Sequence, residues 1–157
     1  MRKVILFIIV ILILSGCDLV FVGQTNEDYW CECPQFETIK SALNYCYSEI
    51  VFMWDVDLYG YFEYWAAPHE TLANMAGDCD DRAILFAYIA HSQFQKDPEI
   101  IYAQKGLKFH LYVRIDGKPY LDNKTGSWND VKVYSYSEIM WIATHSHGIT
   151  PLGKSIQ

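Results

Sequence analysis

The sequence of 157 residues lacks any block of lysine and arginine. Its 12 basic residues are scattered among 19 acidic ones, which gives a formal net charge of −7. Duplex binding draws on clustered cations, so this absence argues against nucleic acid as a partner. The chain also has no internal repeat and no low-complexity block. Its length predicts one domain, and a hydrophobic content of 52% is enough for a core.

No hydrophobic run is long enough for a typical membrane span. The longest, Val4 to Leu14, has 11 residues and follows the basic pair Arg2 and Lys3, which is typical of a signal peptide. The sequence Leu-Ser-Gly-Cys that ends at Cys17 resembles the bacterial lipobox, in which the cysteine is lipidated. We therefore expect a lipoprotein signal peptide at 1–16 and a lipid anchor on Cys17. The alternatives are an ordinary signal peptide or an uncleaved anchor.

A lipid anchor on Cys17 places the protein at the cell membrane, facing the periplasm or the cell exterior. Cysteines are few in this chain, and three remain once Cys17 and Cys79 have been assigned to lipid and to chemistry. One disulfide from Cys31 or Cys33 to Cys46 is possible in an oxidising compartment. A zinc site is the weaker alternative, because Cys31 and Cys33 have no matching second pair of ligands.

The hydrophobic pattern predicts an α+β domain in which helices come first and an antiparallel sheet follows. We expect a tether at 17–34, a domain at 35–146 and a tail at 147–157. Period-3.6 and period-2 patterns predict helices at about 35–54, 68–76, 79–94 and 137–144, and strands at 99–103, 109–115, 119–122 and 131–134. The helix from Cys79 is apolar nearly all round, which indicates a central helix packed on the sheet.

The stretch from Gly77 to Asp81, Gly-Asp-Cys-Asp-Asp, places Cys79 at the start of this central helix. The N–H groups of a helix N-terminus lower the pKa of a cysteine, whereas neighbouring carboxylates raise it. A nucleophilic thiol at this position would therefore need a histidine beside it. His110 is the best-placed candidate, and Asp122 could orient its imidazole.

The turn between the strands that carry His110 and Asp122 decides whether the two side chains share a face. A two-residue turn at Asp116-Gly117 pairs Leu111 with Asp122 and turns His110 to the opposite face. A three-residue turn pairs Tyr112 with Asp122 and leaves His110 diagonal to it on one face. We therefore predict the longer turn, or a bulge.

Several motifs together resemble the bacterial transglutaminase-like cysteine peptidases of the papain-like transglutaminase superfamily. They are Trp65-x-x-Pro68-x-Glu70-Thr71-Leu72, Gly77-Asp78-Cys79-Asp80-Asp81, a histidine on a strand and Tyr120-Leu121-Asp122-Asn123. The resemblance covers about residues 36–135 and implies a papain/transglutaminase-like fold. By the resemblance, Cys79 is the nucleophile, His110 the general base and acid, and Asp122 the orienting carboxylate.

The resemblance also suggests sites around this triad. Some relatives bind calcium through acids near the cysteine, and Asp78, Asp80 and Asp81 are the matching positions, although helix capping also explains these acids. The tetrahedral oxyanion could be held by the backbone N–H of Cys79 and by the side chain of Trp65. No cofactor is required; calcium is the one candidate.

These observations predict a lipid-anchored, extracytoplasmic cysteine hydrolase or acyltransferase that acts on amide bonds of a protein or peptide substrate. Water or an amine would accept the acyl group. The alternative is a catalytically idle transglutaminase-like module that binds a protein or peptide at the cell envelope.

Overall fold

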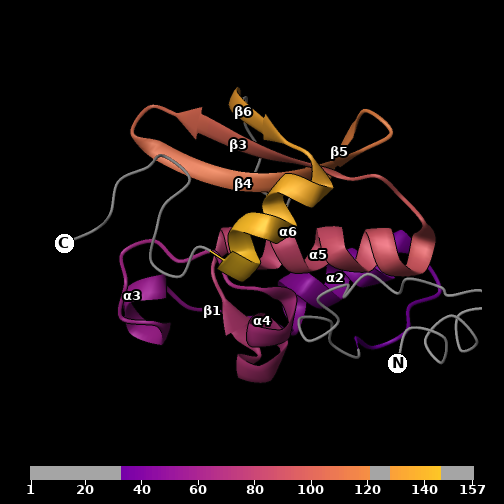
Figure 1. Ribbon diagram of the computed structural model, residues 1–157, viewed down its shortest axis with the longest axis horizontal. Coiled ribbons are helices and arrows are strands. Elements are labelled where there is room, and N and C mark those ends of the chain that lie inside the picture. The colour runs from indigo at the N-terminus through magenta and orange to yellow at the C-terminus, as the bar shows by residue number, and fades with distance from the viewer. Residues whose placement is uncertain (1–32, 121–127, 146–157) are drawn as a thin grey trace, which may run out of the picture.

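The structure is a computed structural model, and it describes residues 33–120 and 128–145. A curved sheet lies over a layer of helices, with α5 between the sheet and the smaller helices (Figure 1). In chain order the elements are α2 (Ile39–Ser48), β1 (Val51–Phe52), α3 (Asp55–Leu58), α4 (Pro68–Asn74), β2 (Ala76–Gly77), α5 (Cys79–Phe94), β3 (Glu99–Lys105), β4 (Lys108–Ile115), β5 (Lys118–Tyr120), β6 (Asn129–Tyr134) and α6 (Tyr136–His145). The predicted mixture of helices and an antiparallel sheet is confirmed.

Helix α5 is the centre of the core, as the sequence predicts. Every residue from Asp80 to Ala90 is buried. The helix begins at Cys79 after the N-cap Asp78, and it ends at Gln95, which has a left-handed backbone. A helix that is apolar nearly all round has to be covered on all sides. Here the sheet covers one side, and α2 and α4 pack on the others.

The first helix is shorter than the predicted span of 35–54. Helix α2 begins after Thr38, whose side chain accepts a hydrogen bond from the Ser41 backbone N–H in a capping box. The chain then leaves the helix because Val51 and Phe52 pair in parallel with Ala76 and Gly77. This pairing joins residues that are distant in sequence, so a local periodicity does not reveal it.

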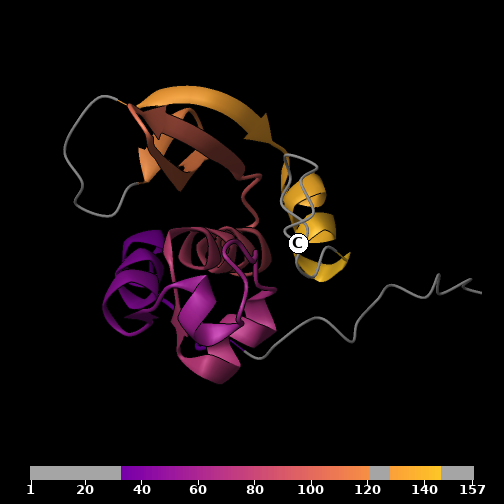
Figure 2. The same ribbon diagram turned by 90° about the vertical axis from the view of Figure 1, so that its left-hand side faces the viewer.

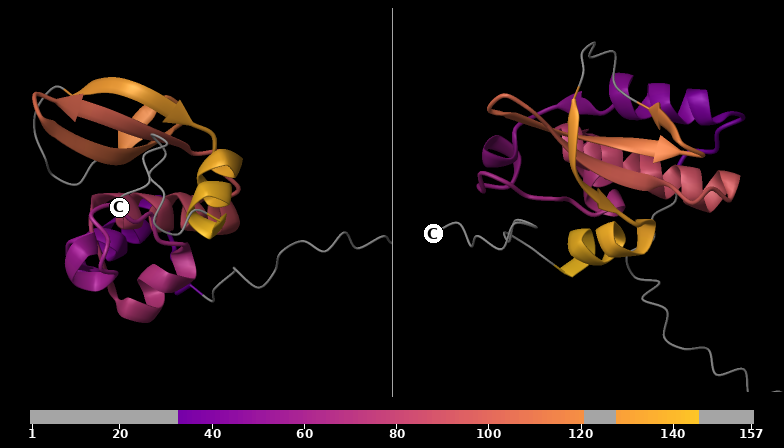
Figure 3. Two further views of the ribbon diagram at one scale, coloured as in Figure 1. Left: turned by 60° about the vertical axis from the view of Figure 1, so that its left-hand side comes forward. Right: turned by 90° about the horizontal axis from the view of Figure 1, so that it is seen from above.

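The four-stranded sheet has the order β5-β4-β3-β6, with antiparallel neighbours. It curves over α5, with α2 along one side and α6 along the other (Figures 2 and 3). Its two faces carry different clusters. The face toward α5 carries Ile100, Tyr102, Leu111, Val113 and Ile115, which join the main core. The opposite face carries Ile101, Ala103 and Tyr112, with Trp128 packed against them.

The hairpin between β4 and β5 contradicts the predicted three-residue turn. Ile115 pairs with Lys118 and Val113 with Tyr120, so the turn has two residues, Asp116 and Gly117. Both have positive φ, 51° and 75°, as a type I′ turn requires. The prediction is wrong because it was chosen to bring His110 and Asp122 to one face, whereas an Asp-Gly pair favours the tight turn.

Candidate functional site

Cys79 lies at the very start of α5 and is half-buried. The Asp78 side chain caps the helix by accepting a hydrogen bond from the Asp80 backbone N–H, with 3.0 Å between Oδ1 and N. The Cys79 thiol donates to Asp80 Oδ1 at 3.9 Å. The predicted setting of the thiol, at a helix N-terminus among carboxylates, is therefore present.

Three carboxylates hold the preceding loop against this helix start. Asp81 Oδ1 accepts a hydrogen bond from the Ala66 backbone N–H at 2.8 Å, and Asp55 Oδ2 accepts one from the Tyr64 N–H at 2.6 Å. Glu70 Oε2 accepts one from the backbone N–H of residue 67 at 2.8 Å. Buried backbone N–H groups need such partners. The loop 64–67 is consequently fixed beside Cys79 by side chains from three helices.

Gly77 is required because Asp81 packs directly on its backbone. A Cβ at this position would lie 2.6 Å from both the Cβ and the Oδ2 atom of Asp81. Real Cβ atoms do not approach other atoms so closely. The glycine of the Gly-Asp-Cys-Asp-Asp stretch thus makes room for the carboxylate that holds the loop.

A compact group of carboxylates forms behind the thiol. Oxygen atoms of Asp55, Asp78 and Asp81 lie within 4.8 Å of one another, and a second group joins Asp78, Cys79 and Asp80. Among the described residues, Asp55 Oδ1 and Asp81 Oδ2 are buried and have no hydrogen-bond partner. The family resemblance suggested Asp78, Asp80 and Asp81 as calcium positions, with helix capping as the alternative. The structure adds Asp55, which no local pattern marks.

The electrostatics of this group favour protons or a cation. Burial raises the pKa of Asp55 well above its usual range, and repulsion from Asp78 and Asp81 raises it further. Burial likewise raises the pKa of Asp81, against the lowering effect of its hydrogen bond from Ala66. Carboxylates this close cannot all be ionised without compensation. Their oxygen atoms are the ligand type that calcium prefers, so these residues could hold such an ion.

Trp65, the predicted oxyanion donor, already uses its indole N–H in another hydrogen bond. Nε1 donates a hydrogen bond to Glu63 Oε1 at 3.0 Å. The ring packs edge-on against Tyr134, with 5.6 Å between centroids. In this arrangement the indole ring packs on another aromatic ring, and its N–H donates to a carboxylate and not to an oxyanion.

Tyr102 is a neighbour of Cys79 that sequence analysis missed. Burial raises the pKa of Tyr102, and the charges of Glu63 and Cys79 raise it further. The residue lies on β3, on the sheet face that covers α5. Only the pairing of β3 with its neighbours shows that this tyrosine faces the thiol helix, so no sequence signal could have identified it.

His110 lies on the other face of the sheet. It pairs with Ala103 across β3 and β4, and directly paired residues share a face. Ala103 belongs to the cluster on the face opposite α5. The imidazole is buried, with its ring centroid 5.2 Å from that of Trp128. Strand alternation therefore turns this side chain away from the face that α5 covers, contrary to the expectation for a Cys79–His110 couple.

Two predicted functional residues, Asp122 and Cys17, lie outside the described residues. The two-residue turn removes the register argument that put Asp122 beside His110. Among the described residues the ladder of β4 and β5 ends at the pair Val113 and Tyr120. A bulge beyond that pair, the predicted alternative to the longer turn, lies outside the described residues.

Cys46 takes no part in a disulfide among the described residues. It is fully buried in the core, and this burial raises the pKa of its thiol far above the usual value. Cys31, one of the two partners considered, lies outside the described residues. The structure thus contradicts the possible Cys33–Cys46 disulfide. Cys46 is a core residue, and Cys79 differs from it in being half-buried at a helix end.

No family model and no curated protein matches this sequence. The resemblance given above consequently depends on the motifs themselves. None of the helices in the described part of the chain has the length and apolar character that a membrane crossing needs.

Proposed function

We propose that the protein is a transglutaminase-like cysteine hydrolase or acyltransferase that acts on amide bonds of a protein or peptide and is anchored by lipid to the outside of the cell membrane. One observation carries the proposal: a half-buried cysteine is the first residue of the central helix. The amide groups of such a helix end favour a negative charge on sulfur. The loop 64–67, which buried carboxylates hold in place, lies beside Cys79.

The chemistry would begin when the Cys79 thiolate attacks the carbonyl carbon of an amide. A carbon–sulfur bond forms, and the tetrahedral oxyanion is stabilised by the backbone N–H of Cys79. The carbon–nitrogen bond then breaks, and the amine leaves with a proton from the general acid. Water releases the acyl group in a hydrolase, and a second amine releases it in an acyltransferase.

His110 would serve this reaction as the base only if its ring reaches the Cys79 sulfur. Strand alternation directs the ring to the opposite face of the sheet, so the start of β4 has to rearrange. Asp122, the proposed orienting carboxylate, then has to lie on the same face as His110.

Calcium at the carboxylate group is part of the proposal. Asp55, Asp78 and Asp81 supply oxygen ligands, and the two partnerless buried oxygens of Asp55 and Asp81 fit a cation. A bound ion would supply charge neutralisation beside the thiol. Addition of calcium should raise the melting temperature, because a ligand that binds the native state alone stabilises it. An unchanged melting temperature at millimolar calcium would contradict the proposed calcium site.

A second candidate function is a catalytically idle module that binds a peptide or protein at the cell envelope. The specific observation in its favour is the position of His110 on the sheet face opposite α5. A fold that has lost its chemistry can keep the cysteine and still lack a base beside it.

Labelling with an electrophilic peptide probe, such as a peptide vinyl sulfone, separates the two candidates. Peptide mapping by mass spectrometry locates the adduct, and Cys79→Ser controls for the other thiols. The enzyme predicts rapid labelling at Cys79 that slows by roughly 100-fold in His110→Ala, the lower range of general-base effects. Absence of labelling in the folded protein at neutral pH would favour the module.

A further inference from the structure

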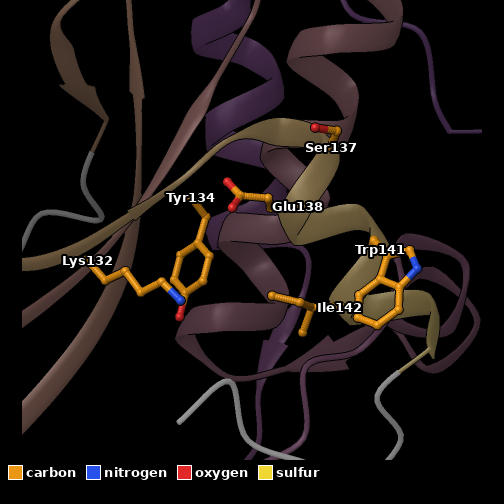
Figure 4. Close-up of a pocket in the computed structure, with 6 residues that line it drawn as sticks. All are labelled: Lys132, Tyr134, Ser137, Glu138, Trp141 and Ile142. Atoms are coloured by element: carbon orange, nitrogen blue, oxygen red, sulfur yellow. The ribbon is translucent and has the colours of Figure 1, made fainter. Parts of the chain in front are cut away.

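A pocket of about 410 Å³ opens between strand β6 and helix α6. Figure 4 shows its walls, with Ile142 between the β6 side chains and the indole of Trp141. The lining residues are Lys132, Tyr134, Ser137, Glu138, Trp141 and Ile142. Trp141 is 61% exposed, and its ring stacks on that of His145 with 5.1 Å between the centroids.

The charged groups of the pocket are one cation, Lys132, and one anion, Glu138. Lys132 Nζ lies 4.3 Å from the centroid of the Tyr134 ring, a cation–π contact that holds the ammonium at the pocket. Glu138 accepts hydrogen bonds from the backbone N–H and the hydroxyl of Ser135, both at 2.8 Å. These bonds and the charge of Lys132 lower the pKa of Glu138. The carboxylate is therefore ionised and held at the start of α6.

Residues that line the pocket pair with or pack against residues of the candidate site. Lys132 pairs directly with Tyr102 across β6 and β3, so both side chains are on the sheet face toward α5. Tyr102 is the residue whose pKa the Cys79 charge raises. Tyr134, two residues after Lys132 on the same strand, packs against Trp65.

This combination of groups matches the last residue of a peptide chain. Such a residue offers a carboxylate for an ammonium, an amide N–H for a carboxylate and a side chain for an apolar wall. Capture of a C-terminal carboxylate is a recurring mode of peptide recognition, and an ammonium group is a charge-assisted donor for it. We propose that the pocket binds the C-terminal apolar or aromatic residue of a peptide, with its carboxylate on Lys132 and its side chain against Trp141 and Ile142.

Binding of this kind needs no reaction at Cys79. It rests on the proposed function only for the fate of the bound peptide, and it stands equally for the idle module. The test therefore uses the full chain with Cys79→Ser, so that turnover cannot obscure binding. If the peptide binds but Cys79 does not react, the proposed function fails and the proposed binding pocket stands. If the peptide does not bind, the proposed binding pocket fails.

The test measures binding of fluorescein-labelled Gly-Ala-Phe by fluorescence anisotropy, as the free acid and as the C-terminal amide. The acid should bind about tenfold more tightly than the amide, the ratio that one charge-assisted hydrogen bond supports. Lys132→Met should abolish this preference. Trp141→Ala should weaken both peptides several-fold.

Two matched controls make the test specific. Trp54→Ala removes a tryptophan that is also 61% exposed but lies far along the chain from the pocket, and Lys108→Met removes an exposed lysine of β4. Both should leave binding unchanged. The proposal is overturned if acid and amide bind equally, if neither binds, or if Lys132→Met keeps the preference. It is also overturned if Trp141→Ala instead abolishes self-association, because the occupant would then be a second copy.

Discussion

The hydrogen bond between Asp81 and the loop beside Cys79 can be tested by two substitutions at one position. Asp81 is fully buried, and its Oδ1 accepts from the Ala66 backbone N–H at 2.8 Å. Asp81→Ala removes the acceptor and leaves a buried N–H without a partner, which costs about 1–3 kcal/mol. Asp81→Asn keeps an oxygen for that N–H and replaces a crowded carboxylate by a neutral amide. We expect the asparagine variant to be at least as stable as the wild type.

Urea denaturation at pH 7 without added calcium, followed by circular dichroism, measures both variants. With a slope of about 1–3 kcal/mol/M, the alanine variant should unfold at a midpoint lower by roughly 1 M. Asp97→Ala, at an exposed aspartate, serves as control and should change stability by less than about 0.5 kcal/mol. Equal destabilisation by alanine and asparagine, or none by alanine, would refute the assignment of this hydrogen bond as the anchor of the loop.

Three further predictions concern the same region. Because the pKa values of Asp55 and Asp81 are raised, the folded state keeps protons that the unfolded chain releases above about pH 4. Without calcium, the free energy of unfolding should therefore fall as the pH rises above about 4. The calcium-induced gain in melting temperature should be larger at pH 8 than at pH 5, and equal gains would contradict this prediction. Gly77→Ala should lower the free energy of unfolding, measured with urea, by about 1–3 kcal/mol because its Cβ would overlap Asp81. Wild-type stability would show instead that the Asp81 side chain can move aside. Arg82→Met should cost about 1–3 kcal/mol, since it removes the Arg82 Nη2 donor to the Ile50 carbonyl oxygen at 2.6 Å; an unchanged urea midpoint would mean that water replaces the bond.

The central helix and the strands could be predicted from the sequence because their signals are local. The apolar run after Cys79 and the N-cap Asp78 gave α5 its observed bounds, Cys79–Phe94. The two-residue pairing of β1 with β2 could not be predicted, since it joins distant segments. For the same reason Asp55 and Tyr102 escaped the sequence-based site, although each lies beside the helix start in space.

The hairpin shows what happens when a functional expectation overrides a local signal. Asp116-Gly117 is the composition of a tight type I′ turn, and the structure has that turn. The longer turn was predicted because a Cys-His-Asp triad requires His110 and Asp122 on one face. The face of His110 follows from its pairing with Ala103, which no local signal predicts. Cys79 lies at the helix start that the sequence predicts.

The rate of Cys79 alkylation is the measurement that tests the central claim most directly. Iodoacetamide is added at pH 7 to the native protein and to the urea-unfolded protein, and the adduct at Cys79 is quantified by mass spectrometry. A thiol activated by the helix end should react at least about tenfold faster in the native protein, because the thiolate is the reactive form. Slower reaction in the native protein than in the unfolded chain would contradict a nucleophilic role for Cys79.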